Sequence, residues 1–210
     1  MNKKLTIYSL VALLTASTIT VSITDTTKAQ QNQSQAPRSA TDKSTEVDKS
    51  FIEMMIPHHQ GAVEMAQMAV KKAKSPEVKK LAESIIKDQN REIGQMRTWY
   101  KQWYGAEVPM TGMNMQMHHG MGHGMGQEMM MAMHHQEMMD QEMMVALKNA
   151  SNFDREFLRQ MISHHEMALM MAGMVVDGAV HPETRKLAKS IIKSQSAEIN
   201  KMGQLSQTIK

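Results

Sequence analysis

Sulfur and imidazole side chains set the chemical character of this sequence. Of its 210 residues, 26 are methionine and 10 are histidine, and there is no cysteine. Thioether sulfur and imidazole nitrogen suit soft cations such as Cu(I) and, by the same softness, Ag(I), whereas thioethers bind Mg²⁺ and Ca²⁺ poorly. The absence of cysteine excludes disulfides, thiolate zinc sites, iron–sulfur clusters and blue-copper centres with a cysteine ligand. The composition therefore predicts a soft-metal site built from Met and His.

The densest cluster of these residues lies in the segment 110–144, which holds 14 Met and 5 His. Its first part is interrupted by glycines and has no regular face to bury, so core packing does not explain its methionines. The candidate ligands there are Met113, Met115, Met117, His118, His119, Met121, His123 and Met125. A second, looser group of candidates follows on a helix predicted over 127–148 and comprises His134, His135 and Met138.

An internal duplication supplies the other candidate ligands. Residues 48–96 align without a gap on residues 154–202, and 25 of the 49 paired positions are identical. Both copies place a Met one helical turn before a His pair, so a thioether and an imidazole can reach the same ion. The candidates on these two faces are Met55, His58, His59 and Met65, with Met161, His164, His165, Met171 and Met174. In the alternative interpretation, such methionines fill the core and the histidines are satisfied interior polar groups.

Each copy predicts two helices separated by a short break. Pro76 and Pro182 stand at the expected first position of each second helix, and Ser75 is an expected N-cap. No run alternates with the period of a strand. The fold class is therefore predicted to be all-α, a four-helix bundle. Its two antiparallel hairpins span 48–104 and 151–210, and a Met/His/Gly-rich loop and linking helix occupy 105–150. Pro57 predicts a kink in the first helix.

The N-terminal residues predict export. Lys3 and Lys4 precede a mostly apolar run, and small residues stand at Thr27 and Ala29, so residues 1–29 are predicted to be a signal peptide cleaved after Ala29. A retained membrane anchor is the alternative. The polar segment 30–47 predicts a flexible lead. The expected location is periplasmic or secreted. The net charge of +3 is too small to indicate a nucleic-acid partner, and no membrane contact beyond the signal peptide is expected.

The duplicated segments FIEMMIPHHQGA (51–62) and FLRQMISHHEMA (157–168) resemble a known family. Exported, ferritin-like domains of unknown function share a helix of the FxxxMIxHHxxA type, and they include a periplasmic copper-binding protein of cyanobacteria. The resemblance covers about 48–210. It implies a helical bundle that binds Cu(I) and Ag(I) and supports copper resistance. It also implies metal-binding roles for the two Met-His-His sets, Met55, His58 and His59 with Met161, His164 and His165.

The same sequence bears on the enzymatic alternatives. Ferritin-like di-iron sites need Glu-x-x-His pairs, and no Glu here is followed by His three residues later; HExxH is absent too. The sequence thus predicts a non-enzymatic protein that sequesters or transfers Cu(I), with metal ions and a copper efflux or transfer protein as partners. Two other functions stay open, namely a Met-rich protein-binding or chaperone module and a metal oxidase of ferritin-like type.

Overall fold

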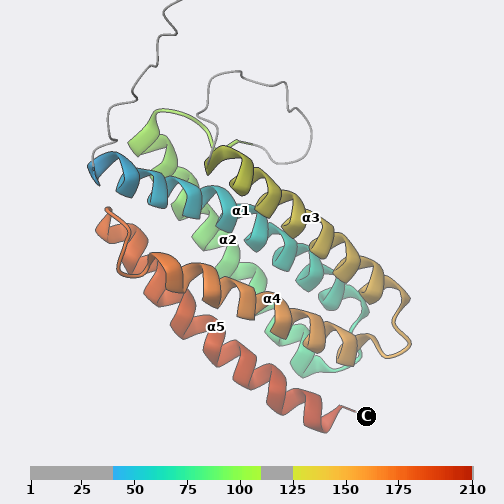
Figure 1. The fold of residues 1–210 in the computed structure, drawn as a ribbon. Helices are drawn as coiled ribbons and strands as arrows, with labels where there is room; N and C mark the ends of the chain where they lie inside the picture. The colour runs from blue at the N-terminus through green and yellow to red at the C-terminus, as the bar shows by residue number, and fades with distance from the viewer. Residues whose placement is uncertain (1–39, 110–124, 210) are drawn as a thin grey trace, which may run out of the picture. The chain divides into compact units, whose positions relative to one another are not determined.

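The computed structural model describes residues 40–109 and 125–209, which form five helices and no strand (Figure 1). The helices are α1 (Ala40–Lys72), α2 (Pro76–Tyr104), α3 (Met125–Asn149), α4 (Phe153–Val175) and α5 (Pro182–Thr208). Helix α1 packs on α2 and α4 packs on α5, while α1 packs against α4 and so joins the two hairpins. These contacts confirm the predicted all-α bundle of two duplicated hairpins.

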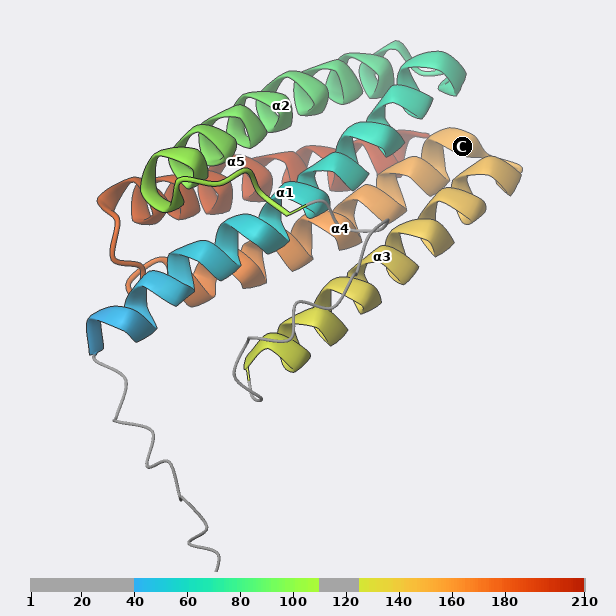
Figure 2. The same ribbon diagram turned by 90° about the horizontal axis from the view of Figure 1, so that it is seen from above.

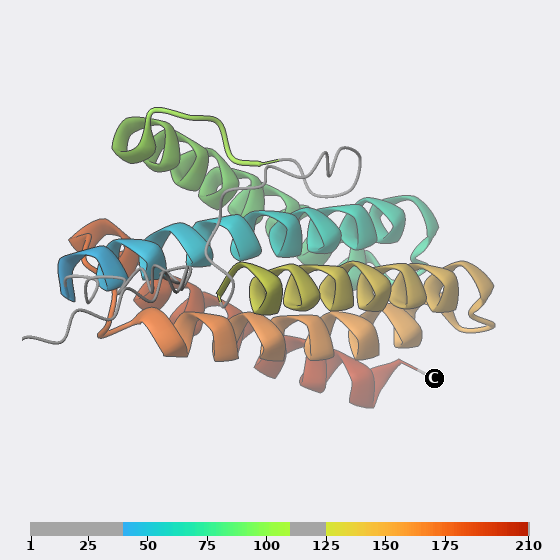
Figure 3. The ribbon, with the colours of Figure 1, turned by 45° about the horizontal axis from the view of Figure 1, so that its top comes forward.

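The linking segment forms a fifth helix that packs against the bundle. Helix α3 contacts α1 and α4. Figures 2 and 3 show it along these two helices, on the face opposite α2 and α5. The helix predicted over 127–148 is therefore confirmed. Helix α1 begins at Ala40, inside the segment 30–47 predicted to be a flexible lead, and it continues through Pro57 without interruption. The predicted signal peptide, residues 1–29, lies outside the described residues.

Local signals explain where the helices of the first hairpin begin and end. The Ser75 hydroxyl accepts a hydrogen bond from the backbone N–H of Val78, and Pro76 follows as the first helical residue. Helix α2 ends at Gly105, whose positive φ of 66° favours glycine and whose N–H bonds to the carbonyl of Lys101. In the second hairpin His181 is the N-cap residue of α5 and Pro182 is the first helical residue.

Two buried aspartates at equivalent positions of the duplication join the hairpins. The Asp154 carboxylate accepts the backbone N–H groups of Lys74, at 2.9 Å, and Ser75, at 2.7 Å, where α2 begins. The Asp48 carboxylate accepts the N–H groups of Val180, at 2.7 Å, and His181, at 3.3 Å, where α5 begins. Each hairpin thus supplies the carboxylate that satisfies the exposed N–H groups at the helix start of the other hairpin.

The apolar core consists of two clusters, each with contributions from both copies. One cluster contains the segment from Phe51 to Ile56 of α1 with Ala168 and Ala172 of α4. The other contains Phe157 to Met161 of α4 with the later residues of α1, from Ala62 onward. The arrangement requires α1 and α4 to run antiparallel, and the His pairs lie between the clusters on both helices. None of the helices in the described ranges is long and apolar enough to cross a membrane.

Candidate metal centre

Four histidines form a buried layer where α1 packs against α4. His58, His59, His164 and His165 are all 0% exposed. The rings of His58 and His164, which occupy equivalent positions in the two copies, approach to 3.8 Å between centroids with an interplanar angle of 43°. The structure therefore brings together the His pairs that the sequence predicts as ligands, and it places them in the interior of the bundle.

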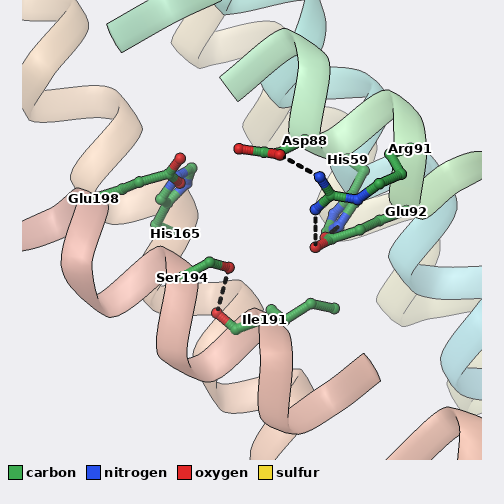
Figure 4. Close-up of polar contacts among 8 residues, drawn as sticks. All are labelled: His59, Asp88, Arg91, Glu92, His165, Ile191, Ser194 and Glu198. Carbon is green, nitrogen blue, oxygen red and sulfur yellow. Dashed lines mark hydrogen bonds and ion pairs between the residues drawn. The ribbon is translucent and has the colours of Figure 1, made fainter. Parts of the chain in front are cut away.

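The second helix of each hairpin supplies a carboxylate to this layer. His59 Nε2 lies 2.8 Å from Glu92 Oε2, and His165 Nε2 lies 2.7 Å from Glu198 Oε2. Figure 4 shows the two pairs, which the duplication relates. An ionised carboxylate only accepts hydrogen bonds, so each Nε2 donates one and, in the neutral imidazole, Nδ1 carries the lone pair. Neither Nδ1 has a hydrogen-bond partner among the described residues. A carboxylate that fixes the tautomer in this way is typical of metal-binding histidines.

The other two histidines are held in the neutral form. Burial, and next the neighbouring imidazole of His164, keep the pKa of His58 well below its ordinary value. Burial also lowers the pKa of His164, against the opposing effect of the Asp140 carboxylate. A neutral imidazole carries a lone pair that can bind a cation. Both ring nitrogens of His58 lack a hydrogen-bond partner among the described residues, as do the side-chain amides of Gln89 and Gln195.

Buried methionines lie on the same helix faces as the histidines. Met55 and Met161 are each 0% exposed and precede their His pairs by one helical turn. Met65 is 1% exposed and lies two turns after His58. In the part of the chain that the structure describes, no three His, Asp or Glu side chains surround a common point. The ligands available in this interior are thus paired imidazoles with thioethers nearby, a set that suits a soft ion of low coordination number.

The two copies differ in their surroundings. Glu92 also lies 3.6 Å from the guanidinium of Arg91, which pairs with Asp88 at 2.5 Å (Figure 4). In the second copy the position equivalent to Arg91 is Ala197, so no arginine precedes Glu198. On the other side of the layer, Asp140 of α3 places Oδ1 at 3.5 Å from His164 Nε2. Helix α3 thus reaches the histidine layer at His164, the first His of the second copy.

The remaining predicted ligands lie apart from this layer. His134, His135 and Met138 are exposed on α3. Met171 and Met174 of α4 line an open groove between α1, α3 and α4, so they do not join the interior set. The predicted loop ligands Met113, Met115, Met117, His118, His119, Met121 and His123 lie outside the described residues, as does the side chain of Met125.

The polar residues of α2 and α5 were missing from the sequence-based candidates. Glu92 and Glu198 are identical in the two copies, and so are Gln89 and Gln195. These residues lie among apolar residues at helical spacing. A polar residue that is identical in both copies at such a position is the signal that could have identified them. Asp140 has no counterpart in the duplication, so the internal comparison carries no signal for it.

Comparison with solved structures finds CopM, which has been determined in Cu(I)-bound, Cu(II)-bound, Ag-bound and apo forms. The Cu(I)-bound CopM is 46% identical, with a TM-score of 0.60 over 77% of this chain and 96% of CopM. A DUF305 protein of Streptomyces coelicolor, described as secreted, is 25% identical over 76% of this chain and 89% of its own, with a TM-score of 0.57.

A curated relative matches a shorter region. The uncharacterized protein L153 of Acanthamoeba polyphaga mimivirus is 41% identical over 51 residues, 24% of this chain, and the match spans about a third (34%) of its length. A family model described as a domain of unknown function, DUF305, matches residues 48–206, the whole of the duplicated region and the helix between its copies. On this match the protein belongs to the DUF305 family.

Proposed function

We propose that this protein is exported and binds Cu(I), and Ag(I), through Met thioethers and His imidazoles. It holds the ion for sequestration or for transfer to a copper efflux or transfer protein, and it catalyses no reaction. The main supporting observation is the duplicated carboxylate–imidazole pair, His59 with Glu92 and His165 with Glu198. Both Nδ1 atoms are buried and have no hydrogen-bond partner among the described residues. The likeness to CopM, solved with copper and silver, supports the identity of the ion.

The chemistry of the surrounding side chains supports a soft ion over a hard one. Met55 and Met161 offer uncharged, polarisable sulfur within one turn of each His pair. Neutral imidazoles and thioethers leave the positive charge of the ion partly uncompensated, and Glu92 and Glu198 supply that compensation from behind the imidazoles. Because thioether sulfur is a soft ligand, the two methionines favour Cu(I) over Zn²⁺ and Cu²⁺ at this site.

Anaerobic titration with Cu(I) against a chromogenic chelator tests the proposal. The unmodified protein is expected to retain Cu(I) at micromolar concentration, and failure to retain any would end the proposal. In the double variant Glu92→Gln/Glu198→Gln the amide keeps the shape of the carboxylate but loses its charge. The affinity of the interior site should then fall by about 10 to 100-fold, as is typical when a carboxylate that hydrogen-bonds to a metal-binding histidine is lost.

A matched control separates this effect from a general change of charge. Glu83 and Glu166 are exposed carboxylates on α2 and α4, so Glu83→Gln/Glu166→Gln removes the same charge without touching a histidine. This control is expected to bind Cu(I) as the unmodified protein does. An equal loss of affinity in both double variants would contradict a specific role of the interior Glu–His pairs in binding Cu(I). Export has its own test, because mass spectrometry of the secreted form should give Gln30 as its first residue.

A further inference from the structure

A groove on the surface carries a second concentration of thioethers. It lies between α1, α3 and α4 and has a volume of about 850 Å³. Met54 of α1 and Met139 and Met144 of α3 contribute to its walls, and four methionines of α4 complete them. The groove is open to solvent, whereas the histidine layer is buried, so the two sets of ligands differ in access.

The methionines of α4 form a continuous stripe along this groove. Met167, Met170, Met171 and Met174 follow the spacing i, i+3, i+4, i+7, which places them on one helix face. Met170 is 62% exposed and Met174 is 64% exposed, and they stand one turn apart. Methionines that fill the core are fully buried, as Met202 is. Packing therefore does not explain why two large thioethers project side by side into water.

The charged residues of the groove favour a cation. Glu64, Glu137 and Asp140 line it with carboxylates, and Lys148 is the single ammonium among its lining residues in the described chain. The imidazole of His135 also borders the groove. Neutral sulfur ligands within a weakly negative wall attract a positive ion and do not repel it on contact. An anionic ligand would meet three carboxylates and no site for charge pairing other than Lys148.

The groove adjoins the interior layer at one residue. Asp140 lines the groove and also lies 3.5 Å from His164 Nε2. Gly61 of α1 permits this position, because a Cβ there would lie 2.9 Å from Asp140 Oδ2. The equivalent residue of the second copy is Met167, which contributes sulfur to the groove. At this position the two copies differ. Gly61 of α1 leaves room for the Asp140 side chain, and Met167 of α4 adds a thioether to the groove.

We propose that the groove is a second, solvent-open site for a soft monovalent cation, bound by the thioethers of Met170 and Met174 with their neighbours. The site is distinct from the buried histidine pairs, and it holds the ion where it exchanges with solvent or with another protein. The inference rests on the proposed function for the nature of the ion, because it assigns Cu(I) or Ag(I) to both sites. It adds a location and an access route that the interior pairs lack.

Silver titration of protein labelled with ¹³C in the Met methyl groups tests this site. Ag(I) is diamagnetic and resistant to oxidation, so methyl shifts report binding directly. The methyl signals of Met170 and Met174, assigned by single Met→Leu variants, are expected to shift on addition of silver nitrate in chloride-free buffer. The variant Met170→Leu/Met174→Leu keeps an apolar side chain of similar size. By native mass spectrometry it should bind one silver ion fewer than the unmodified protein.

Met131→Leu provides the matched control, since Met131 is 63% exposed on α3 and does not line the groove. It should bind as many silver ions as the unmodified protein. Shifts at Met55 and Met161 with Met170 and Met174 unmoved would overturn the groove site and leave the proposed function intact. No silver or copper binding at all would overturn both. Groove methyls that respond to an amphipathic peptide but not to Ag(I) would overturn the site and identify a protein-docking surface.

Discussion

At the scale of single residues, Asp48 and Asp154 are polar side chains that link the two hairpins. Each is buried and accepts two backbone N–H groups at the start of a helix in the other hairpin. Hydrogen bonds to a charged acceptor are stronger than neutral ones, and N–H groups left without a partner in a buried place are costly. Because each aspartate links two different hairpins, the loss of either weakens their association.

Replacing either aspartate with alanine should destabilise the protein by about 2–3 kcal/mol, the value of charge-assisted hydrogen bonds whose donors are left unpaired. The two effects should add in Asp48→Ala/Asp154→Ala, because the aspartates share no partner. Urea unfolding followed by circular dichroism measures both. Asp177→Ala is the control, since Asp177 is exposed in the break between α4 and α5 and its loss should change stability by less than about 0.5 kcal/mol. Equal effects for Asp48 and Asp177 would contradict the interpretation.

At the scale of elements, the duplicated hairpins were predictable and the position of α3 was not. Apolar residues at helical spacing, Ser75 and the two prolines defined the helices of both copies, and the repeated pattern doubled each signal. The sequence pattern does not encode which helix faces of the two copies pack against each other. The His pairs were predicted as ligands from the repeat, but their carboxylate partners lie 33 residues further along the chain. Neither link has a local sequence signature.

Besides its apolar contacts with the core, helix α3 makes a polar contact that only the three-dimensional structure shows. Its Asp140 side chain fits against Gly61 and reaches toward His164, and Gln136 donates a hydrogen bond to the same carboxylate at 2.9 Å. In the sequence, Gly61 differs from its repeat partner Met167 without an evident reason. The structure supplies the reason, because a side chain at position 61 would collide with the carboxylate.

Gly61→Ala should therefore loosen α3 while leaving the four-helix bundle intact. The added methyl displaces the Asp140 carboxylate and removes its contact with His164, a loss of about 1 kcal/mol that corresponds to roughly fivefold faster amide exchange in α3. Gly94→Ala is the control, because nothing lies within 4 Å of a Cβ there. It should stabilise α2 by about 0.5–1 kcal/mol through helix propensity and leave α3 unchanged. Identical hydrogen exchange of α3 in both variants would contradict this placement.

At the scale of the whole molecule, the histidine layer divides the apolar core into two clusters that both copies share. A fully apolar layer would bury more hydrophobic surface and leave no polar atom unsatisfied. The bundle therefore gives up stability at its centre, and two diverged copies retain identical polar residues there, as expected if that centre is the metal site proposed above. The same layer makes the metal-free protein sensitive to acid, because burial disfavours the charged forms of His58 and His164.

The free energy of unfolding of the metal-free protein should fall as the pH is lowered from about 6.5 to 5. The folded-state pKa values of His58 and His164 are lowered, chiefly by burial. In the unfolded chain each imidazole takes up a proton near its ordinary pKa of about 6.5. The unfolded state thus binds more protons in this range, and stability falls with decreasing pH by up to about 1.4 kcal/mol per pH unit for each histidine. Above pH 7 these imidazoles are neutral in both states, so this loss of stability is absent.

Urea unfolding at pH 7.5, 6.5, 5.5 and 5.0 measures this slope above the range in which most carboxylates titrate. His58→Gln/His164→Gln should flatten the curve, because glutamine is polar but does not titrate, whereas the exposed pair His134→Gln/His135→Gln should leave it unchanged. A stability that is constant between pH 7 and 5 in the unmodified protein would contradict a neutral, buried histidine layer. Saturating Ag(I) should shift the loss of stability to lower pH, since a metal-bound imidazole nitrogen is not available to a proton.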